Sequence, residues 1–128
     1  TLAGPTVLYF YPKADTPGCT NEAKDFTAHA DAFAKAGVTV IGVSKDPVKK
    51  LDKFKAKYDL KVTLASDEET GVTEAYGVWV EKSMYGKTYM GIERATFLID
   101  GAGVVRRVWR KVSVKGHAEE VLAAVQAL

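Results

Sequence analysis

Cysteine occurs only once in this 128-residue chain, at Cys19. A single thiol excludes an intramolecular disulfide, so the chain must be stabilised by an apolar core, and its length is sufficient for one. An unpaired thiol is compatible with a reducing compartment, and we therefore expect a cytoplasmic protein.

Long apolar runs and an excess of one charge are also missing. No stretch approaches the roughly 20 apolar residues of a membrane helix, and no signal peptide is visible. The 18 basic and 16 acidic residues give a formal charge of +2. This near balance gives no reason to expect nucleic acid or a membrane as a partner. The lysines between Lys49 and Lys57 alternate with Leu51 and Phe54, which is typical of a solvated helix face.

The spacing of apolar and turn residues predicts one domain in which strands and helices alternate. Short apolar runs predict strands at residues 7–11, 38–43, 63–65, 94–100 and 104–109, of which the first two are expected to be buried. Apolar residues three to four apart predict helices at residues 20–37, 47–58, 72–76 and 118–128. Residues 78–93 are less regular and are interpreted as a long connection or a hairpin. The expected fold class is α/β, with a mixed sheet and helices on both faces.

Turn residues indicate where two of these helices begin. Asp46 is the expected N-cap of the helix that ends at Tyr58, with Pro47 at its first position. The cap-like run Ser66–Glu69 precedes the brief helix that begins at Val72.

Cys19 lies on a turn between the first strand and the first helix. There the unpaired N–H groups and the helix dipole favour a thiolate over a thiol. Thr16 can hydrogen-bond a bound oxygen, and Pro12 and Pro17 stiffen the loop. Gly18 allows close approach to the sulfur. This pattern favours a reactive cysteine.

Three other interpretations of the cysteine are weaker. A buried, inert cysteine is disfavoured because Cys19 lies outside the apolar stripes, in a polar turn. A dithiol site needs Cys-x-x-Cys, and Glu22 stands at the second position. A metal site is disfavoured because His29 and His117 are far apart in the sequence and each fits a helix surface or cap.

The motif Pro12-x-x-x-Thr16-x-x-Cys19 resembles the active-site signature of the peroxiredoxins. The surrounding residues resemble the bacterioferritin comigratory protein branch, also called peroxiredoxin Q, over essentially the whole chain. The matching blocks are Tyr9–Lys13, Asp15–Thr20, Glu22–Ala23, Gly42–Asp46, Phe54 with Lys57–Tyr58, Ser66–Asp67, Tyr76–Trp79 and Arg94–Asp100.

The resemblance implies a thioredoxin-like fold, with no cofactor, and a thiol peroxidase that reduces hydrogen peroxide and organic hydroperoxides in antioxidant defence. Cys19 would be the peroxidatic cysteine, whose thiolate attacks the peroxide and becomes a sulfenic acid. Thr16 would hydrogen-bond the peroxide, and Arg94 would stabilise the thiolate and the developing charge on oxygen.

The remaining roles carried over from the family concern the shape of the site. Pro12 would shield the sulfur, and the backbone N–H groups of Gly18 and Cys19 would complete the oxygen site. Glu22 could orient Arg94, although a glutamate in the first turn is also explained by the helix dipole alone.

The chain departs from many relatives in having no resolving cysteine. Two positions where relatives carry one hold Lys24 and Lys55. We therefore expect a one-cysteine enzyme that needs an external thiol, such as thioredoxin, glutaredoxin or glutathione. The alternative is a redox sensor or binding module with little turnover. A general thiol–disulfide oxidoreductase is disfavoured by the absent second cysteine.

Two expectations rest on the family alone. Members of this branch are often monomers, so a monomer is expected. They usually begin with a β-hairpin ahead of the first strand, and we interpret residues 1–128 as a single domain that lacks it.

The aromatic residues Trp79, Tyr85 and Tyr89 could favour bulky organic peroxides or simply pack on the core.

Overall fold

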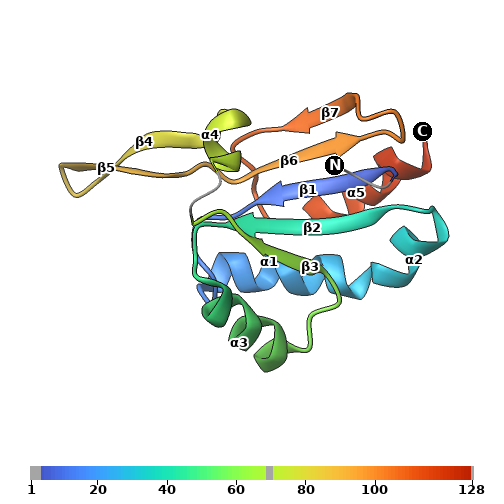
Figure 1. Ribbon diagram of the computed structural model, residues 1–128, viewed down its shortest axis with the longest axis horizontal. Coiled ribbons are helices and arrows are strands. Elements are labelled where there is room, and N and C mark those ends of the chain that lie inside the picture. Colours follow the sequence, from blue (N-terminus) through green and yellow to red (C-terminus); the bar gives the residue numbers. More distant parts are fainter. Residues whose placement is uncertain (1–3, 69–70, 128) are drawn as a thin grey trace.

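A computed structural model describes residues 4–68 and 71–127. It contains a five-stranded mixed sheet (Figure 1). In spatial order the strands are β3 (Thr63–Ser66), β2 (Thr39–Ser44), β1 (Thr6–Phe10), β6 (Ala95–Ile99) and β7 (Val105–Trp109). The central strand β1 is parallel to β2 and antiparallel to β6, and all of its residues are buried. The predicted strands and the mixed sheet are confirmed.

Helices cover both faces of this sheet, as predicted, but unequally (Figure 1). The four helices on one face are α1 (Pro17–Ala28), α2 (Ala30–Lys35), α3 (Val48–Tyr58) and α5 (His117–Gln126). They bury Phe26, Phe54 and Val121 against the side of β1 that carries Tyr9. The short helix α4 (Val72–Ala75) lies on the other face, where Phe10 is buried.

The prediction of one continuous helix over residues 20–37 is wrong, because the helix breaks at His29. The His29 N–H donates to the Phe26 carbonyl, three residues back, and the His29 carbonyl accepts from Phe33 to start α2. The apolar spacing crosses the break because Phe26 and Phe33 enter the same core, with ring centroids 5.9 Å apart.

Asp46 does not cap α3, contrary to the prediction. The helix begins at Val48 with Pro47 as its N-cap. The Asp46 carboxylate instead accepts hydrogen bonds from the backbone N–H of Ala14 at 2.7 Å and from the Ser44 hydroxyl at 2.8 Å. It therefore holds the loop that carries the cysteine.

The predicted cap before α4 is partly confirmed. The Asp67 carboxylate accepts hydrogen bonds from the backbone N–H groups of Val72 and Thr73, which satisfies two donors of the first turn. Glu69, the last residue of the predicted cap, lies outside the described residues.

Residues 78–93 form a hairpin of β4 (Trp79–Met84) and β5 (Lys87–Ile92) that projects from the body of the domain (Figure 1). Tyr85 and Gly86 both have positive φ, which fits a two-residue hairpin turn. At the base of the hairpin, Ile92 is buried in the core cluster around Phe10, and the partly buried Trp79 packs against that cluster. Among the described residues, no helix has the length and apolar character needed to cross a membrane.

Candidate active site

Cys19 is the third residue of α1 and is 2% exposed. The loop that leads to it, residues 11–16, is called the cysteine loop below. Thr16 occupies the N-cap position, and its carbonyl accepts from the Thr20 N–H at 2.8 Å. Its hydroxyl does not cap the helix but donates to the Lys13 carbonyl at 2.8 Å.

Arg94 reaches the sulfur from a distant part of the sequence. Its Nη2 lies 3.2 Å from Cys19 Sγ, and its Nη1 lies 2.7 Å from Glu22 Oε1. The strand register explains this contact, since Ala95 at the start of β6 pairs with Phe10 at the end of β1. The residue just before β6 therefore lies where the chain leaves β1 towards the cysteine.

The ionisable groups of this cluster shift one another's pKa values because they are buried close together. Glu22 is 1% exposed, and burial raises its pKa to about 7, against the opposing effect of Arg94. Burial lowers the pKa of Arg94, but the charges of Glu22 and Cys19 outweigh it, so the net pKa is raised. The guanidinium is thus a fixed positive charge beside the sulfur.

Glycine at position 18 is explained by the guanidinium. A Cβ added at Gly18 would lie 3.3 Å from Arg94 Nη2, a tight contact. Cys19, Arg94, Glu22 and Gly18 are therefore brought together in one cluster.

Pro12 and Thr16, the other predicted site residues, both belong to the cysteine loop. Pro12 is exposed and lines a separate pocket with residues of the hairpin. For neither residue does the described structure record a contact with the side chain of Cys19.

The contacts that anchor the cysteine loop to α3 were not predicted from the sequence. Asp15 accepts a hydrogen bond of 2.6 Å from the Tyr58 hydroxyl and one of 3.0 Å from Lys57 Nζ. Asp15, Lys57 and Tyr58 all belong to blocks that resemble the family, which is the signal that the sequence carries. Lys24, at one expected resolving position, stacks over the Tyr58 ring with Nζ 5.0 Å from its centroid.

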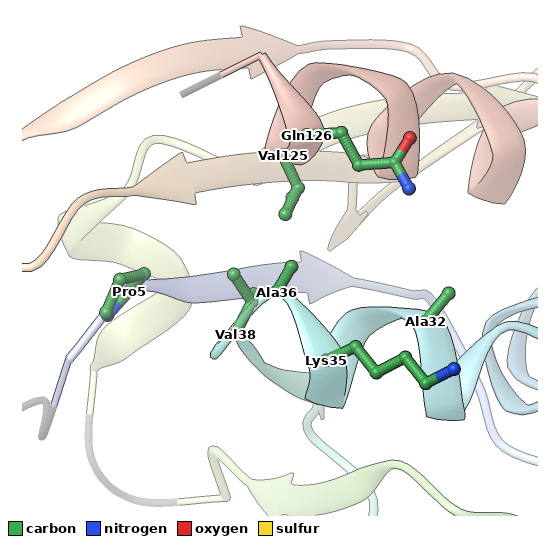
Figure 2. A pocket seen from close by; sticks show the side chains of 7 residues that line it. All are labelled: Pro5, Ala32, Lys35, Ala36, Val38, Val125 and Gln126. Atoms are coloured by element: carbon green, nitrogen blue, oxygen red, sulfur yellow. The ribbon is translucent and has the colours of Figure 1, made fainter.

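Another pocket, of about 520 Å³, lies at the start of β1, at the end of the strand away from the cysteine loop (Figure 2). It is bounded by Pro5, Val38, α2 and the end of α5, and among the described residues Lys35 is its only charged lining side chain. Its described lining holds no cysteine, serine or histidine.

Comparison with known proteins places the chain in a family. The AhpC/TSA family matches residues 1–108. A putative peroxiredoxin Bcp of Coxiella burnetii is 56% identical over 116 residues, which cover 91% of this chain and 77% of that protein. Peroxiredoxin Bcp of Bacillus subtilis is 50% identical over 120 residues, which cover 94% of this chain and 76% of that protein.

Solved structures agree with the sequence comparison. Peroxiredoxin Q of Xanthomonas campestris matches with a TM-score of 0.92 and 50% identity, over 98% of this chain and 79% of that one. BcpB of Mycobacterium tuberculosis matches with a TM-score of 0.85 and 38% identity, over 98% and 80% of the two chains. The thioredoxin-like fold follows from these matches. The chain belongs to the AhpC/TSA family, among the peroxiredoxins of the Bcp and peroxiredoxin Q type.

Proposed function

We propose that this peroxiredoxin is a one-cysteine thiol peroxidase whose reactive group is the Cys19 thiolate. The observation that carries the proposal is the contact of 3.2 Å between Arg94 Nη2 and Cys19 Sγ. A fixed positive charge at this distance stabilises a thiolate, and it also stabilises the negative charge that develops on oxygen as the peroxide bond breaks.

The oxidation step follows from this arrangement. The Cys19 thiolate attacks one peroxide oxygen, and a sulfur–oxygen bond forms while the oxygen–oxygen bond breaks. The leaving oxygen takes a proton and departs as water or an alcohol. The sulfur loses two electrons and becomes a sulfenic acid.

The other residues of the site position the peroxide and the guanidinium. The Thr16 hydrogen already goes to the Lys13 carbonyl, so Thr16 would accept a hydrogen bond from the peroxide hydroxyl. Glu22 fixes Arg94 through the 2.7 Å contact. Pro12 would shield the sulfur, and the Gly18 and Cys19 N–H groups would bind oxygen.

The return to the thiol needs an outside molecule, because the chain contains no second cysteine. Lys24 and Lys55 occupy the two positions where relatives carry a resolving cysteine. We infer that thioredoxin, glutaredoxin or glutathione supplies the missing thiol. If none does so, the same site would act as a redox sensor, which is the second candidate function.

The setting we propose is a cytoplasmic, monomeric enzyme of one domain that acts in antioxidant defence. The single unpaired cysteine supports a reducing compartment. Both hydrogen peroxide and organic hydroperoxides are proposed as substrates. The Xanthomonas campestris bacterioferritin comigratory protein, a structural relative with 49% identity, has an alkyl peroxide reduction activity.

Peroxide consumption and trapping of the oxidised sulfur test the proposal together. The reduced protein should consume one equivalent of hydrogen peroxide and give a dimedone adduct at Cys19, and Cys19→Ser should do neither. Steady-state turnover with thioredoxin, glutaredoxin and glutathione then separates the two candidate functions. A fast first oxidation with no turnover on any thiol would favour the sensor, and no adduct at all would refute both.

A further inference from the structure

The pocket that Pro12 lines lies between the cysteine loop and the base of the β4–β5 hairpin. We call it the hairpin pocket, and its volume is about 350 Å³. Its lining includes Pro12, Lys13, Trp79, Lys82, Tyr89 and Ile92. This volume is typical of small-molecule sites, which span about 300–1,000 Å³.

Three lysines line the hairpin pocket, but only one is already engaged with acidic groups. Lys45 lies 3.7 Å from Asp67 and 3.8 Å from Glu74. Lys13 and Lys82 form no ion pair with any residue in the ranges 4–68 and 71–127. Two positive charges are therefore available to a ligand.

The stem of Lys82 leans towards the base of the hairpin. A Cβ at Gly91 would lie 3.2 Å from Lys82 Cδ and 3.5 Å from its Cε, so the stem lies across this glycine. In the strand register Lys82 faces Tyr89, and Gly91 is two residues nearer the base. The stem therefore directs the ammonium group towards the base of the hairpin, not towards its tip.

The surroundings of Lys82 favour an anion. Burial lowers its pKa, the positive charge of Arg94 lowers it further, and the charges of Cys19 and Glu93 raise it. Lys82 is thus a half-buried cation within electrostatic reach of both the sulfur and the guanidinium. A bound carboxylate would compensate this arrangement.

Oxidation of Cys19 makes the site more positive. The thiolate is one of the negative charges that balance Lys82 and Arg94. A neutral sulfenic acid no longer supplies that charge, and in this state the site must receive a reductant, not a peroxide. The gain in positive charge therefore favours an anionic reductant.

We propose that the hairpin pocket binds a small thiol that carries carboxylates, of the glutathione type, with Lys82 as the residue that selects it. The inference rests on the proposed peroxidase function and names the class of its reductant. The thiol body would pack on Trp79 and Tyr89, and its carboxylate would pair with Lys82, with Lys13 at the rim.

The resulting reduction balances with two molecules of thiol. The first attacks the sulfenic sulfur, a mixed disulfide forms with Cys19, and the oxygen leaves as water. The second attacks the sulfur of the bound thiol, which releases the Cys19 thiol and a small-molecule disulfide. Two thiols are oxidised for each peroxide reduced.

The test compares glutathione with its diethyl ester, which has the same thiol and backbone but no carboxylates. The readout is the ratio of their rate constants with protein oxidised at Cys19. Lys82→Gln should lower this ratio by roughly fivefold, since one partly buried charge pair is lost, and added salt should lower it in the unsubstituted protein. Lys87→Gln is the matched control, because Lys87 lies on the same hairpin next to its turn and does not line the pocket. An equal ratio in all three proteins would overturn the proposal.

Binding of S-methylglutathione to Cys19→Ser, in which a neutral hydroxyl replaces the thiolate, tests the pocket without any redox chemistry, and both lysine substitutions are made in this background. Its affinity should fall by roughly fivefold in Lys82→Gln and stay unchanged in Lys87→Gln. If no sulfenic acid forms, the proposed function fails, and this measurement still decides on the pocket. No binding, or equal binding to both variants, would refute the pocket.

A peroxide with a carboxylate is the other possible source of the anion. The rates at which a carboxylate-bearing hydroperoxide and its methyl ester oxidise Cys19 measure the effect of a carboxylate on the peroxide. If Lys82→Gln lowers the acid-to-ester rate ratio for the peroxide but not for the thiol, the pocket selects the peroxide, and the proposal that it binds the reductant is refuted.

Discussion

The Tyr58 hydroxyl donates a hydrogen bond of 2.6 Å to the Asp15 carboxylate, which ties the last turn of α3 to the cysteine loop. Asp15 has a φ of 61°, an unusual value for a residue other than glycine. The backbone next to Thr16 therefore adopts a conformation that the contact with α3 helps to hold.

Removing this tether should slow oxidation of the cysteine more than it affects folding. Tyr58→Phe keeps the ring but removes the hydroxyl, so Thr16 and Pro12 are held less firmly. We expect stopped-flow oxidation by hydrogen peroxide to slow by roughly 3- to 10-fold, because misplaced positioning groups lose rate steeply. The thermal midpoint should barely change, since the Asp15 contact is exposed. Tyr85→Phe, on an exposed tyrosine at the hairpin turn, is the control, and equal rates in both variants would contradict this role.

Arg94 should not be replaceable by lysine. Its two terminal nitrogens contact Cys19 and Glu22 at the same time, and an ammonium group cannot reproduce this fork. Arg94→Lys should slow oxidation of Cys19 by roughly 100-fold, the usual effect of losing one stabilising donor. Arg106→Lys, on the exposed strand β7, should leave the rate unchanged. A loss below threefold in Arg94→Lys would show that a positive charge alone is sufficient.

The strands and the pairing of Cys19 with Arg94 could be predicted from the sequence because each had a local pattern or a family motif. The sequence did not predict the break at His29, since Phe26 and Phe33 keep helical spacing across it. It misassigned Asp46 because an aspartate before Pro47 fits an N-cap, whereas the carboxylate is taken by Ala14, 32 residues earlier. The hairpin pocket depends on contacts between distant segments, which no local pattern records.

A methyl group at position 42 should disrupt the core around Tyr9. A Cβ on Gly42 would lie 2.6 Å from the Tyr9 ring, and Tyr9 is fully buried against Phe26. Gly42→Ala should therefore lower the free energy of unfolding by about 1–3 kcal/mol, as overpacked cores do. Gly101→Ala is the control, because its Cβ would meet Pro5 at an ordinary 3.7 Å. Equal chemical denaturation curves for the two variants would refute the predicted clash.

His117 should make the fold sensitive to acid. Its Nε2 lies 2.7 Å from the Thr96 hydroxyl, and burial lowers its pKa below 6.5. The folded state therefore resists protonation, so its stability is complete above pH 6.5 and falls as the pH drops towards the lowered pKa. In His117→Gln, denaturation between pH 7 and 5 should show a smaller loss of stability than in the unsubstituted protein. His29→Gln should keep the full loss, and a loss of the same size in both variants would contradict the prediction.

Glu22 should act in the opposite direction, with stability falling as the pH rises. Burial raises its pKa from 4.5 to about 7, so between these values the unfolded chain releases a proton that the folded chain keeps. Below pH 4.5 the effect is absent, and above pH 7 it should reach about 3 kcal/mol. Glu22→Gln keeps an oxygen for Arg94 but cannot ionise, so the unsubstituted chain should lose that amount relative to this variant between pH 4.5 and 8. Urea denaturation in a Cys19→Ser background isolates the carboxyl from the thiol. If the difference between the two proteins is instead independent of pH, Glu22 is already ionised at pH 4.5 and its pair with Arg94 outweighs the burial.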